Sequence, residues 1–222
     1  MFFSKIVLRQ DSEATARLAL QVCRDGYRLH QTLWELFSEG IDERRRDFLY
    51  RRLEQQDWPC FYTVSAQPPV DKLGLWDCGQ PKPYSPSLSN GERLAFSLCA
   101  NPVITRRNER SKPVRHDVVM HAKKQLEDSD STTLAELIQQ TGQEWLQTRA
   151  EKHGFRLEQV RVDGYRQHRL WKGRGIAPIR FSTLEFNGLL TVLDSGQFVN
   201  TLYHGIGPAK GFGCGLLLVR RV

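Results

Sequence analysis

The segment F-F-S-K-I-V-L (residues 2–8) is apolar and short, which predicts a β-strand at the start of the chain. Residues 13–37 follow with apolar side chains at helical spacing, so we predict a helical segment that breaks near Gly26. Residues 48–53 and 61–66 are typical of two further strands. The N-terminal half therefore has the order β-α-β-β.

The second half begins after a stretch rich in proline, glycine and serine, residues 68–91, which we interpret as a linker or irregular edge. Residues 93–100 then alternate between apolar and other side chains, the period of a half-buried strand. The later elements that we predict are a helix at 118–126, a helix from Thr133, paired extended segments at 155–171 and 179–193, a helix at 195–203 and a strand at 216–219.

The order of elements decides the fold class. With β-α-β-β-α-β in the second half, we predict an α+β protein made of two tandem ferredoxin-like (βαββαβ) domains, each a sheet with helices on one face. We place the N-terminal domain at residues 1–85 and the C-terminal domain at residues 92–222. The two halves show no visible sequence repeat, so the duplication is inferred from architecture alone.

The composition favours a folded, basic protein. The chain has 222 residues, of which 40% are hydrophobic, so wholesale disorder is not expected. Lys plus Arg number 32 and Asp plus Glu number 25, which gives a net charge of +7. The surplus is concentrated in residues 102–116 and 154–180, while the rest of the chain is near balance. Two positive segments of this kind are typical of a footprint for phosphates.

Cysteine usage and the N-terminus indicate the compartment. The chain has five cysteines and no C-x-x-C pair, which favours reduced thiols in a cytosolic protein. No apolar run is long enough for a membrane span, and the start M-F-F-S-K-I-V-L-R-Q lacks the apolar region of a signal peptide. We therefore expect a cytoplasmic protein with no membrane partner.

The sequence offers little for metal chemistry. The six histidines form no H-E-x-x-H motif and no Cys/His cluster, and the carboxylates are scattered. No set of acidic residues suits a two-metal nuclease. We expect no metal site and no cofactor, although spacing alone does not exclude ligands brought together from distant segments.

The most informative pair is Tyr27 and His30, in Y-R-L-H. They are three residues apart on a predicted helix, so their side chains share a face. That face lies roughly a quarter turn from the apolar stripe of Leu29, Leu33 and Leu36, which places the pair at the edge of the core. A histidine can move protons near neutral pH, and a tyrosine hydroxyl can orient a phosphate. The alternative is that both residues only pack at the core boundary.

The C-terminal run G-I-G-P-A-K-G-F-G-C-G spans residues 205–215. Its glycines allow the backbone to approach a ligand and to direct N–H groups at a phosphate, and Lys210 adds a positive charge. The run lacks the G-K-[ST] of a P-loop and precedes no long helix. A plain turn is the alternative. The candidate glycines are Gly205, Gly207, Gly211, Gly213 and Gly215.

Arginine and lysine side chains in the two basic segments are candidates for RNA contacts. Arginine can stack on bases and bond phosphates or guanine edges with two hydrogen bonds. A solvated loop is the alternative for the first segment, and Tyr165 and Trp171 in the second could equally be core residues or base-stacking platforms. The candidates are Arg106, Arg107, Arg110, Lys112 and Arg115 in the first segment, and Arg166, Arg169 and Lys172 in the second.

Several of these motifs together resemble one family. The opening F-F-S-K-I-V-L and the string Y-R-L-H-Q-T-L-W-E-L-F are similar to the N-terminal region of the CasE family, the CRISPR RNA-processing endoribonucleases of the type I-E Cascade complex. The similarity continues through nearly the whole chain. The further matching strings are F-Y-T-V-S-A-Q-P-P, C-A-N-P, F-N-G-L-L-T-V and G-I-G-P-A-K-G-F-G-C-G-L-L.

The resemblance implies two ferredoxin-like domains, metal-free cleavage of CRISPR repeat RNA beside its hairpin, and retention of the product among the other Cascade subunits. By position, His30 matches the family's catalytic histidine and Tyr27 its tyrosine partner. Residues 205–215 match the family's Gly-rich loop, and residues 106–115 lie where the family places a basic element against the RNA stem. That basic element is short here. The assignments of Arg166, Arg169 and Lys172 rest on charge and location.

From this we predict attack by the ribose 2′-hydroxyl on the adjacent phosphorus, which gives a 2′,3′-cyclic phosphate and a 5′-hydroxyl. The main alternative is a non-catalytic module that binds RNA hairpins, although no RNP1 string is present. A nucleotide-dependent enzyme that uses the Gly-rich run, and a purely structural scaffold, are further alternatives.

Overall fold

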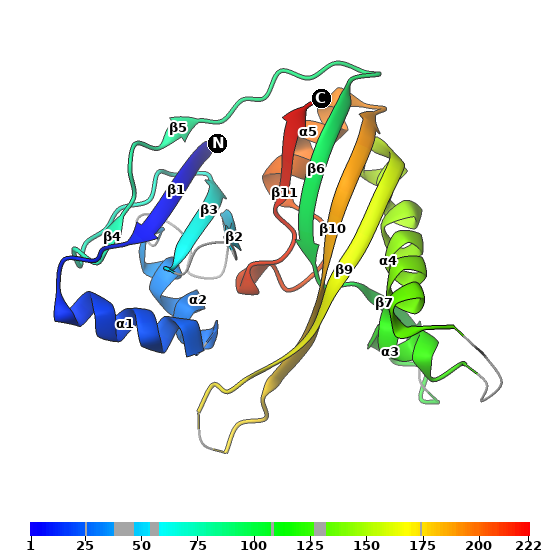
Figure 1. The fold of residues 1–222 in the computed structure, drawn as a ribbon, viewed down its shortest axis with the longest axis horizontal. Coiled ribbons are helices and arrows are strands. Elements are labelled where there is room, and N and C mark those ends of the chain that lie inside the picture. Colours follow the sequence, from blue (N-terminus) through cyan, green and yellow to red (C-terminus); the bar gives the residue numbers. More distant parts are fainter. Residues whose placement is uncertain (25, 38–46, 54–57, 108, 127–131, 174) are drawn as a thin grey trace.

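The computed structural model describes residues 1–222 except 25, 38–46, 54–57, 108, 127–131 and 174 (Figure 1). Its N-terminal part is an antiparallel sheet with the order β2-β3-β1-β4, with β5 pairing the start of β1. Two helices, α1 and α2, lie on one face of this sheet. The elements are β1 (Phe2–Leu8), α1 (Glu13–Arg24), α2 (Gly26–Glu35), β2 (Phe48–Arg52), β3 (Cys60–Ser65), β4 (Trp76–Asp77) and β5 (Lys82–Pro83).

Alternation along the strands gives the N-terminal sheet two different faces. On β3, Phe61 packs with the helices in the N-terminal core, whereas Tyr62 and Val64 face the other way. Leu29 and Leu33 of α2 are buried in that core, as the helical spacing predicts. The predicted break of the first helical segment is also confirmed, because α1 ends at Arg24 and α2 begins at Gly26. Asp25 itself lies outside the described residues.

The C-terminal part is a second antiparallel sheet, with the order β11-β6-β10-β9. Helices α4 and α5 cover one face and bury Trp145, Leu146, Phe198 and Leu202 against it. Its connectivity is βαββαβ, as predicted. The elements are β6 (Arg93–Ala100), α3 (Val118–Lys123), α4 (Leu134–Ala150), the 3-10 turn η1 (Glu151–His153), β9 (Phe155–Leu170), β10 (Ile179–Val192), α5 (Ser195–His204), η2 (Lys210–Phe212) and β11 (Leu217–Arg221).

Two local features were not predicted, and a third was predicted only as a linker or irregular edge. The basic segment forms a separate two-stranded sheet, β7 (Val103–Arg107) with β8 (Pro113–Asp117). The stretch at 68–91 contains the two short strands β4 and β5, so it is partly an edge of the N-terminal sheet. In that sheet the segment 66–75 connects β3 to β4 without a helix, where a ferredoxin-like unit would have its second helix.

The hairpin of β9 and β10 projects beyond its sheet as a long ribbon toward α2 (Figure 1). A register shift between Thr183 and Glu185 marks a β-bulge in this ribbon. Gly164, opposite the shift, has φ +63°, and a Cβ there would lie 3.0 Å from Glu185 Cγ. Glycine is therefore required where the ribbon leaves the sheet, because bulges of this kind need a left-handed residue.

The two sheets turn their helix-free faces toward each other. Leu49 and Val64 from the first sheet share a small apolar cluster with Leu216 from the second. An ion pair joins the sheets as well, with Arg51 Nη2 at 2.7 Å from Glu185 Oε2. The candidate site residues Tyr27 and His30 lie on α2, beside the ribbon and the space between these faces.

Candidate active site

Helix α2 carries Tyr27 and His30 at the edge of the N-terminal core. Leu29 and Leu33 are buried, while Tyr27 and His30 are only partly buried. The quarter-turn offset predicted from the sequence is thus present in the structure. The pair lies on a surface that can meet a ligand, and not in a sealed interior.

His30 is packed between two aromatic rings. The Trp34 ring lies edge-on at 5.6 Å between centroids, and the Phe212 ring lies tilted at 5.4 Å. Phe212 belongs to η2, inside the C-terminal glycine run. The Tyr50 hydroxyl donates a hydrogen bond of 3.0 Å to the Gly211 carbonyl and anchors the same turn to β2. The glycine run and α2, far apart in the chain, therefore meet at His30.

The glycine run is folded closely on itself. Gly205 and Gly215 have φ of +72° and +91°, and a Cβ on Gly205 would lie 2.6 Å from the Gly215 carbonyl oxygen. The amides of Gly205, Ile206, Phe212 and Gly215 donate to backbone carbonyls. These four N–H groups stabilise the loop, so the predicted role of the run as a phosphate cradle does not extend to them.

The ribbon closes the other side of the site. The Phe181 ring stacks on Phe212 at 5.3 Å, and the His168 ring stacks on Phe181 at 4.6 Å. His168 Nε2 lies 2.9 Å from Thr183 Oγ1. A row of stacked rings therefore runs from His30 on α2 through the glycine run to the ribbon.

The tip of the ribbon places Lys172 beside Tyr27 of α2. Lys172 Nζ lies 5.9 Å from the centre of the Tyr27 ring. Leu170 also packs next to α2, because a Cβ on Gly26 would be 3.2 Å from Leu170 Cδ2. Tyr27, His30 and Lys172 thus border one place on the surface.

A cleft of about 760 Å³ lies between the two helix-free sheet faces and the ribbon. Its lining carries three arginines, Arg51, Arg52 and Arg166, and two carboxylates, Asp163 and Glu185, of which Glu185 pairs with Arg51. Cys99 also lines it, and the hydrogen bond with Cys214, burial and the nearby Glu185 raise the pKa of the Cys99 thiol. Cys99 therefore stays a neutral thiol and is not a candidate nucleophile.

Comparison with known proteins identifies the family. The family model described as CRISPR associated protein matches residues 1–221. The Escherichia coli (strain K12) protein named CRISPR system Cascade subunit CasE is 31% identical over 223 residues, covering 98% of each chain. The chain belongs to the CasE family.

Further likenesses extend over the whole CasE-family chain. The Thermus thermophilus CRISPR-associated endoribonuclease Cse3 is 28% identical, with 99% of each chain covered. A solved structure of the CRISPR endoribonuclease Cse3 bound to 19 nt RNA has a TM-score of 0.70 and 28% identity, and covers 99% of this chain and 100% of that one. The predicted fold of two ferredoxin-like domains is confirmed.

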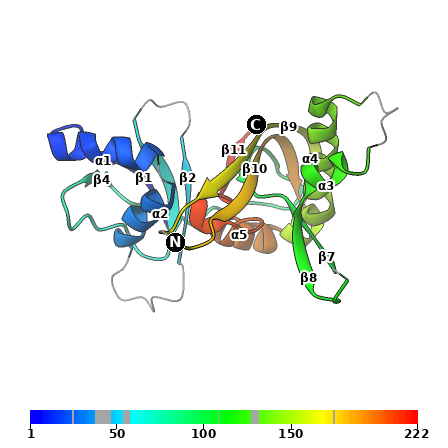
Figure 2. The same ribbon diagram turned by 90° about the horizontal axis from the view of Figure 1, so that it is seen from below.

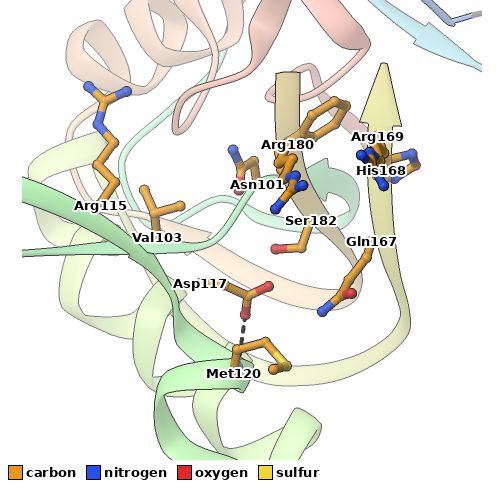
Figure 3. Close-up of a pocket in the computed structure, with 11 residues that line it drawn as sticks. Asn101, Val103, Arg115, Asp117, Met120, Gln167, His168, Arg169, Arg180 and Ser182 are labelled. Atoms are coloured by element: carbon orange, nitrogen blue, oxygen red, sulfur yellow. Dashed lines mark hydrogen bonds between the residues drawn. The ribbon is translucent and has the colours of Figure 1, made fainter. Parts of the chain in front are cut away.

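The basic residues predicted in this CasE-family chain fall in separate places. The five from the first segment are exposed on the β7–β8 hairpin, which projects away from the C-terminal sheet (Figure 2). Arg166 lines the cleft between the sheets, whereas Arg115 and Arg169 line a second pocket on the other side of the ribbon (Figure 3). Trp171 is 54% exposed, so the interpretation of it as a core residue is wrong.

Lys210 does not point to the same place as His30. Its Cγ packs close to Gly215, and its charge helps burial to lower the pKa of His153. The charge of Lys210 acts on His153 in η1, at the end of α4. The predicted contact of Lys210 with RNA therefore stays a prediction, because its position beside Gly215 and His153 does not test that contact.

Sequence reasoning missed the aromatic residues that surround His30. Phe212 and Phe181 were not candidates, although Phe212 stands within the glycine run that was singled out. Among the described residues, no group of three or more His, Cys, Asp or Glu side chains is arranged to hold a metal ion. The helices that the structure describes include none that is long and apolar enough to cross a membrane.

Proposed function

We propose that this CasE-family protein is an endoribonuclease that cuts CRISPR repeat RNA at the base of its hairpin. The relatives support this reading, since one is named an endoribonuclease and has been solved with RNA bound. The observation that carries the proposal is the convergence of Tyr27, His30 and Lys172 from α2 and the ribbon at one partly exposed place. The name of the Escherichia coli relative further supports retention of the product as a Cascade subunit.

The proposed reaction is a transesterification within the RNA. The ribose 2′-hydroxyl loses its proton and attacks the adjacent phosphorus, while the bond to the 5′-oxygen of the next nucleotide breaks. That oxygen takes up a proton, which leaves a 2′,3′-cyclic phosphate and a 5′-hydroxyl. Because the RNA supplies its own nucleophile, the reaction needs no metal-bound water.

Each of the three residues has a distinct role in this proposal. His30 is the main proton-transfer group, since an imidazole can both accept and donate a proton near neutral pH. Tyr27 orients the scissile phosphate through its hydroxyl. Lys172 stabilises the negative charge that develops on the phosphate oxygens, which the preorganised position of its side chain beside Tyr27 favours.

RNA recognition in this proposal uses charge and shape. The exposed cations of the β7–β8 hairpin would contact phosphates of the stem, because the deep, narrow major groove of A-form RNA hides most base edges. Such contacts make affinity fall as salt concentration rises. The cationic lining of the cleft would hold the strand on the way to His30.

Single-turnover cleavage of the host's own repeat RNA in EDTA tests the mechanism. The wild type should cut, and His30→Ala should cut roughly 10²- to 10⁴-fold more slowly while binding the RNA normally. His204→Ala is a matched control, because His204 is an exposed histidine at the end of α5. An RNA with 2′-deoxyribose at the cut should bind and remain intact.

Two outcomes would contradict the proposal. Loss of wild-type cleavage in EDTA would remove the metal-independent mechanism. RNA binding without cleavage by the wild type would favour the alternative, a non-catalytic module that binds RNA hairpins. End-group analysis of the products should find the cyclic phosphate and the 5′-hydroxyl.

We also propose that residues 1–85 and 92–222 are the two folding units. The N-terminal core draws its residues from the first range and the largest C-terminal core draws its buried residues from the second. Limited proteolysis should cut between residues 85 and 92 before it cuts either sheet.

A further inference from the structure

A second pocket lies on the side of the ribbon that faces the β7–β8 hairpin (Figure 3). Its volume is about 680 Å³, within the range of sites that take small ligands. The described residues that line it come from the β6–β7 junction, the β7–β8 hairpin, α3 and the two strands of the ribbon. Its polar and charged lining includes Asn101, Arg115, Asp117, Arg169, Arg180 and Ser182.

The ribbon separates this pocket from the His30 site. Arg180 pairs with Arg169 across the ribbon, and Ser182 pairs with Gln167, so these four side chains share one face and line the pocket. The alternate residues His168 and Phe181 point to the opposite face, where their rings lead toward His30, although both also border the pocket. The two sites are therefore back to back on the same pair of strands.

Two buried polar groups in the pocket wall lack a hydrogen bond. Asn101 is 6% exposed and Ser182 is 3% exposed. Neither Asn101 Oδ1 nor Ser182 Oγ has a hydrogen-bond partner among the residues that the structure describes. Leaving a buried polar atom unpaired is unfavourable, so each such group in a folded protein calls for a reason. Both atoms belong to residues that line the pocket.

The charge around these groups suits a polyanion. Arg115, Arg169 and Arg180 are exposed at the pocket and come from both of its sides. Asp117, the one carboxylate among the described residues that line the pocket, is already engaged, because Oδ1 accepts from two amides at the start of α3 and Oδ2 accepts from the Tyr165 hydroxyl at 2.7 Å. The pocket thus offers exposed cations near buried polar atoms, with Arg169 lying over the Trp171 ring at 4.6 Å and Asp117 held by its hydrogen bonds.

We infer that this pocket binds one unpaired nucleotide of the RNA, with Asn101 and Ser182 bonded to its base and the arginines placed against its phosphates. Asn101 Oδ1 can only accept, so the base must present an N–H group, as the amino groups of adenine, cytosine and guanine do. Arginine is the usual partner for phosphate oxygens. The inference rests on the proposed function and adds a specificity site to it.

The position of the pocket favours RNA over a free nucleotide. It lies between the basic β7–β8 hairpin and the ribbon whose tip brings Lys172 to Tyr27. A strand that leaves a stem on the hairpin and continues to the cut must pass the ribbon. A nucleotide held there would fix the register between the stem and the scissile phosphate.

Ser182→Ala tests the inference without threatening the fold, because it removes a hydroxyl that has no partner among the described residues. Binding is measured with the repeat RNA made uncleavable by 2′-deoxyribose at the cut. Ser182→Ala should weaken binding roughly 5- to 10-fold, the effect of losing one hydrogen bond at a buried site. Ser4→Ala is the matched control, since Ser4 Oγ on β1 is equally buried and unpaired. It should bind like the wild type.

A second arm identifies the nucleotide. Each unpaired position of the RNA is replaced in turn by an abasic residue, and binding is compared for the wild type and Ser182→Ala. At one position the two losses should not add, because both remove the same contact. Additive losses at every position would overturn the inference. So would wild-type affinity in both Ser182→Ala and Asn101→Ala.

The remaining arm uses adenosine 5′-monophosphate. Weak binding that Ser182→Ala weakens further supports binding of the nucleotide as part of the RNA, because the same base contact is lost. Tight binding that Ser182→Ala abolishes, together with unchanged RNA affinity, would make the pocket a free-nucleotide site and overturn it. If the wild type neither binds nor cuts the RNA, the proposed function itself fails. If the wild type binds and cuts the RNA, and Ser182→Ala and Asn101→Ala have the same RNA affinity as the wild type, only the inference about the pocket fails.

Discussion

Phe212 offers the sharpest test of how His30 is held. Its ring contacts His30 at 5.4 Å on one side and Phe181 at 5.3 Å on the other. Aromatic contacts of this kind contribute about 0.5–1.5 kcal/mol each. If the contact with His30 keeps the imidazole in its productive orientation, then Phe212→Ala lowers the productive fraction, and the cleavage rate, by about 2- to 12-fold.

The assay is single-turnover cleavage with the protein in excess, read beside RNA affinity. Phe212→Ala should slow the cleavage step and leave affinity near that of the wild type. Phe212→Tyr keeps the ring and should restore the rate. In our account Phe212 positions His30 and does not itself touch the RNA at the cut.

Phe3→Ala supplies the matched control. Phe3 is also partly buried and contacts two rings, Tyr62 at 5.3 Å and Tyr84 at 5.6 Å, but it lies on β1 away from His30. Both variants should lower the melting temperature to a similar degree, and only Phe212→Ala should slow cleavage. Equal cleavage rates in the two variants would refute the positioning role.

Three further predictions follow from charge. Lys172→Gln should slow cleavage at saturating RNA by more than tenfold, whereas Lys172→Arg should recover part of the rate; equal rates for Lys172→Gln and the wild type would contradict its role at the phosphate. Replacing Arg106 and Arg107 together by glutamine should remove about two phosphate contacts. In a salt titration, the logarithm of RNA affinity should then fall less steeply with the logarithm of salt concentration. An unchanged slope would mean that the RNA stem does not contact these two arginines. The hydrogen bond from Arg93 lowers the pKa of Glu158, so this group stabilises the fold above the ordinary glutamate pKa of 4.5 and loses that contribution as pH falls through its lowered pKa. The melting temperature of Glu158→Gln should therefore fall less at acid pH than that of the wild type. An unchanged pH dependence of the melting temperature would contradict this role of Glu158.

The fold was predictable where one face of an element is buried. Strands β6 and β1 alternate because one side packs on a core, and α2 shows its apolar stripe for the same reason. The β7–β8 hairpin was not predicted as strands, because its residues are mostly exposed on both faces. Its strands are recognised by their backbone pairing, which leaves no hydrophobic pattern in the sequence.

The site was predictable only in part, for a related reason. Tyr27 and His30 are close in sequence, so helical geometry alone places them together. Phe212 and Lys172 reach them from distant segments, through the turn of the glycine run and the length of the ribbon. Neither distance in sequence nor residue type indicates such a meeting, which depends on how the two sheets pack.

The ribbon explains why two sites can depend on one pair of strands. Successive residues of a strand point to opposite faces, so the rings of His168 and Phe181 lead toward Phe212 while Arg169 and Arg180 face the second pocket, which His168 and Phe181 also border. A shift of one residue in the pairing of these strands would exchange the two faces and disrupt both sites together. The bulge at Gly164 sets the register of the ribbon tip relative to the sheet. Gly164→Ala, which strains a residue at φ +63° and crowds Glu185, should therefore reduce cleavage and pocket-dependent RNA binding in the same variant, whereas a substitution confined to one face should affect only one of them.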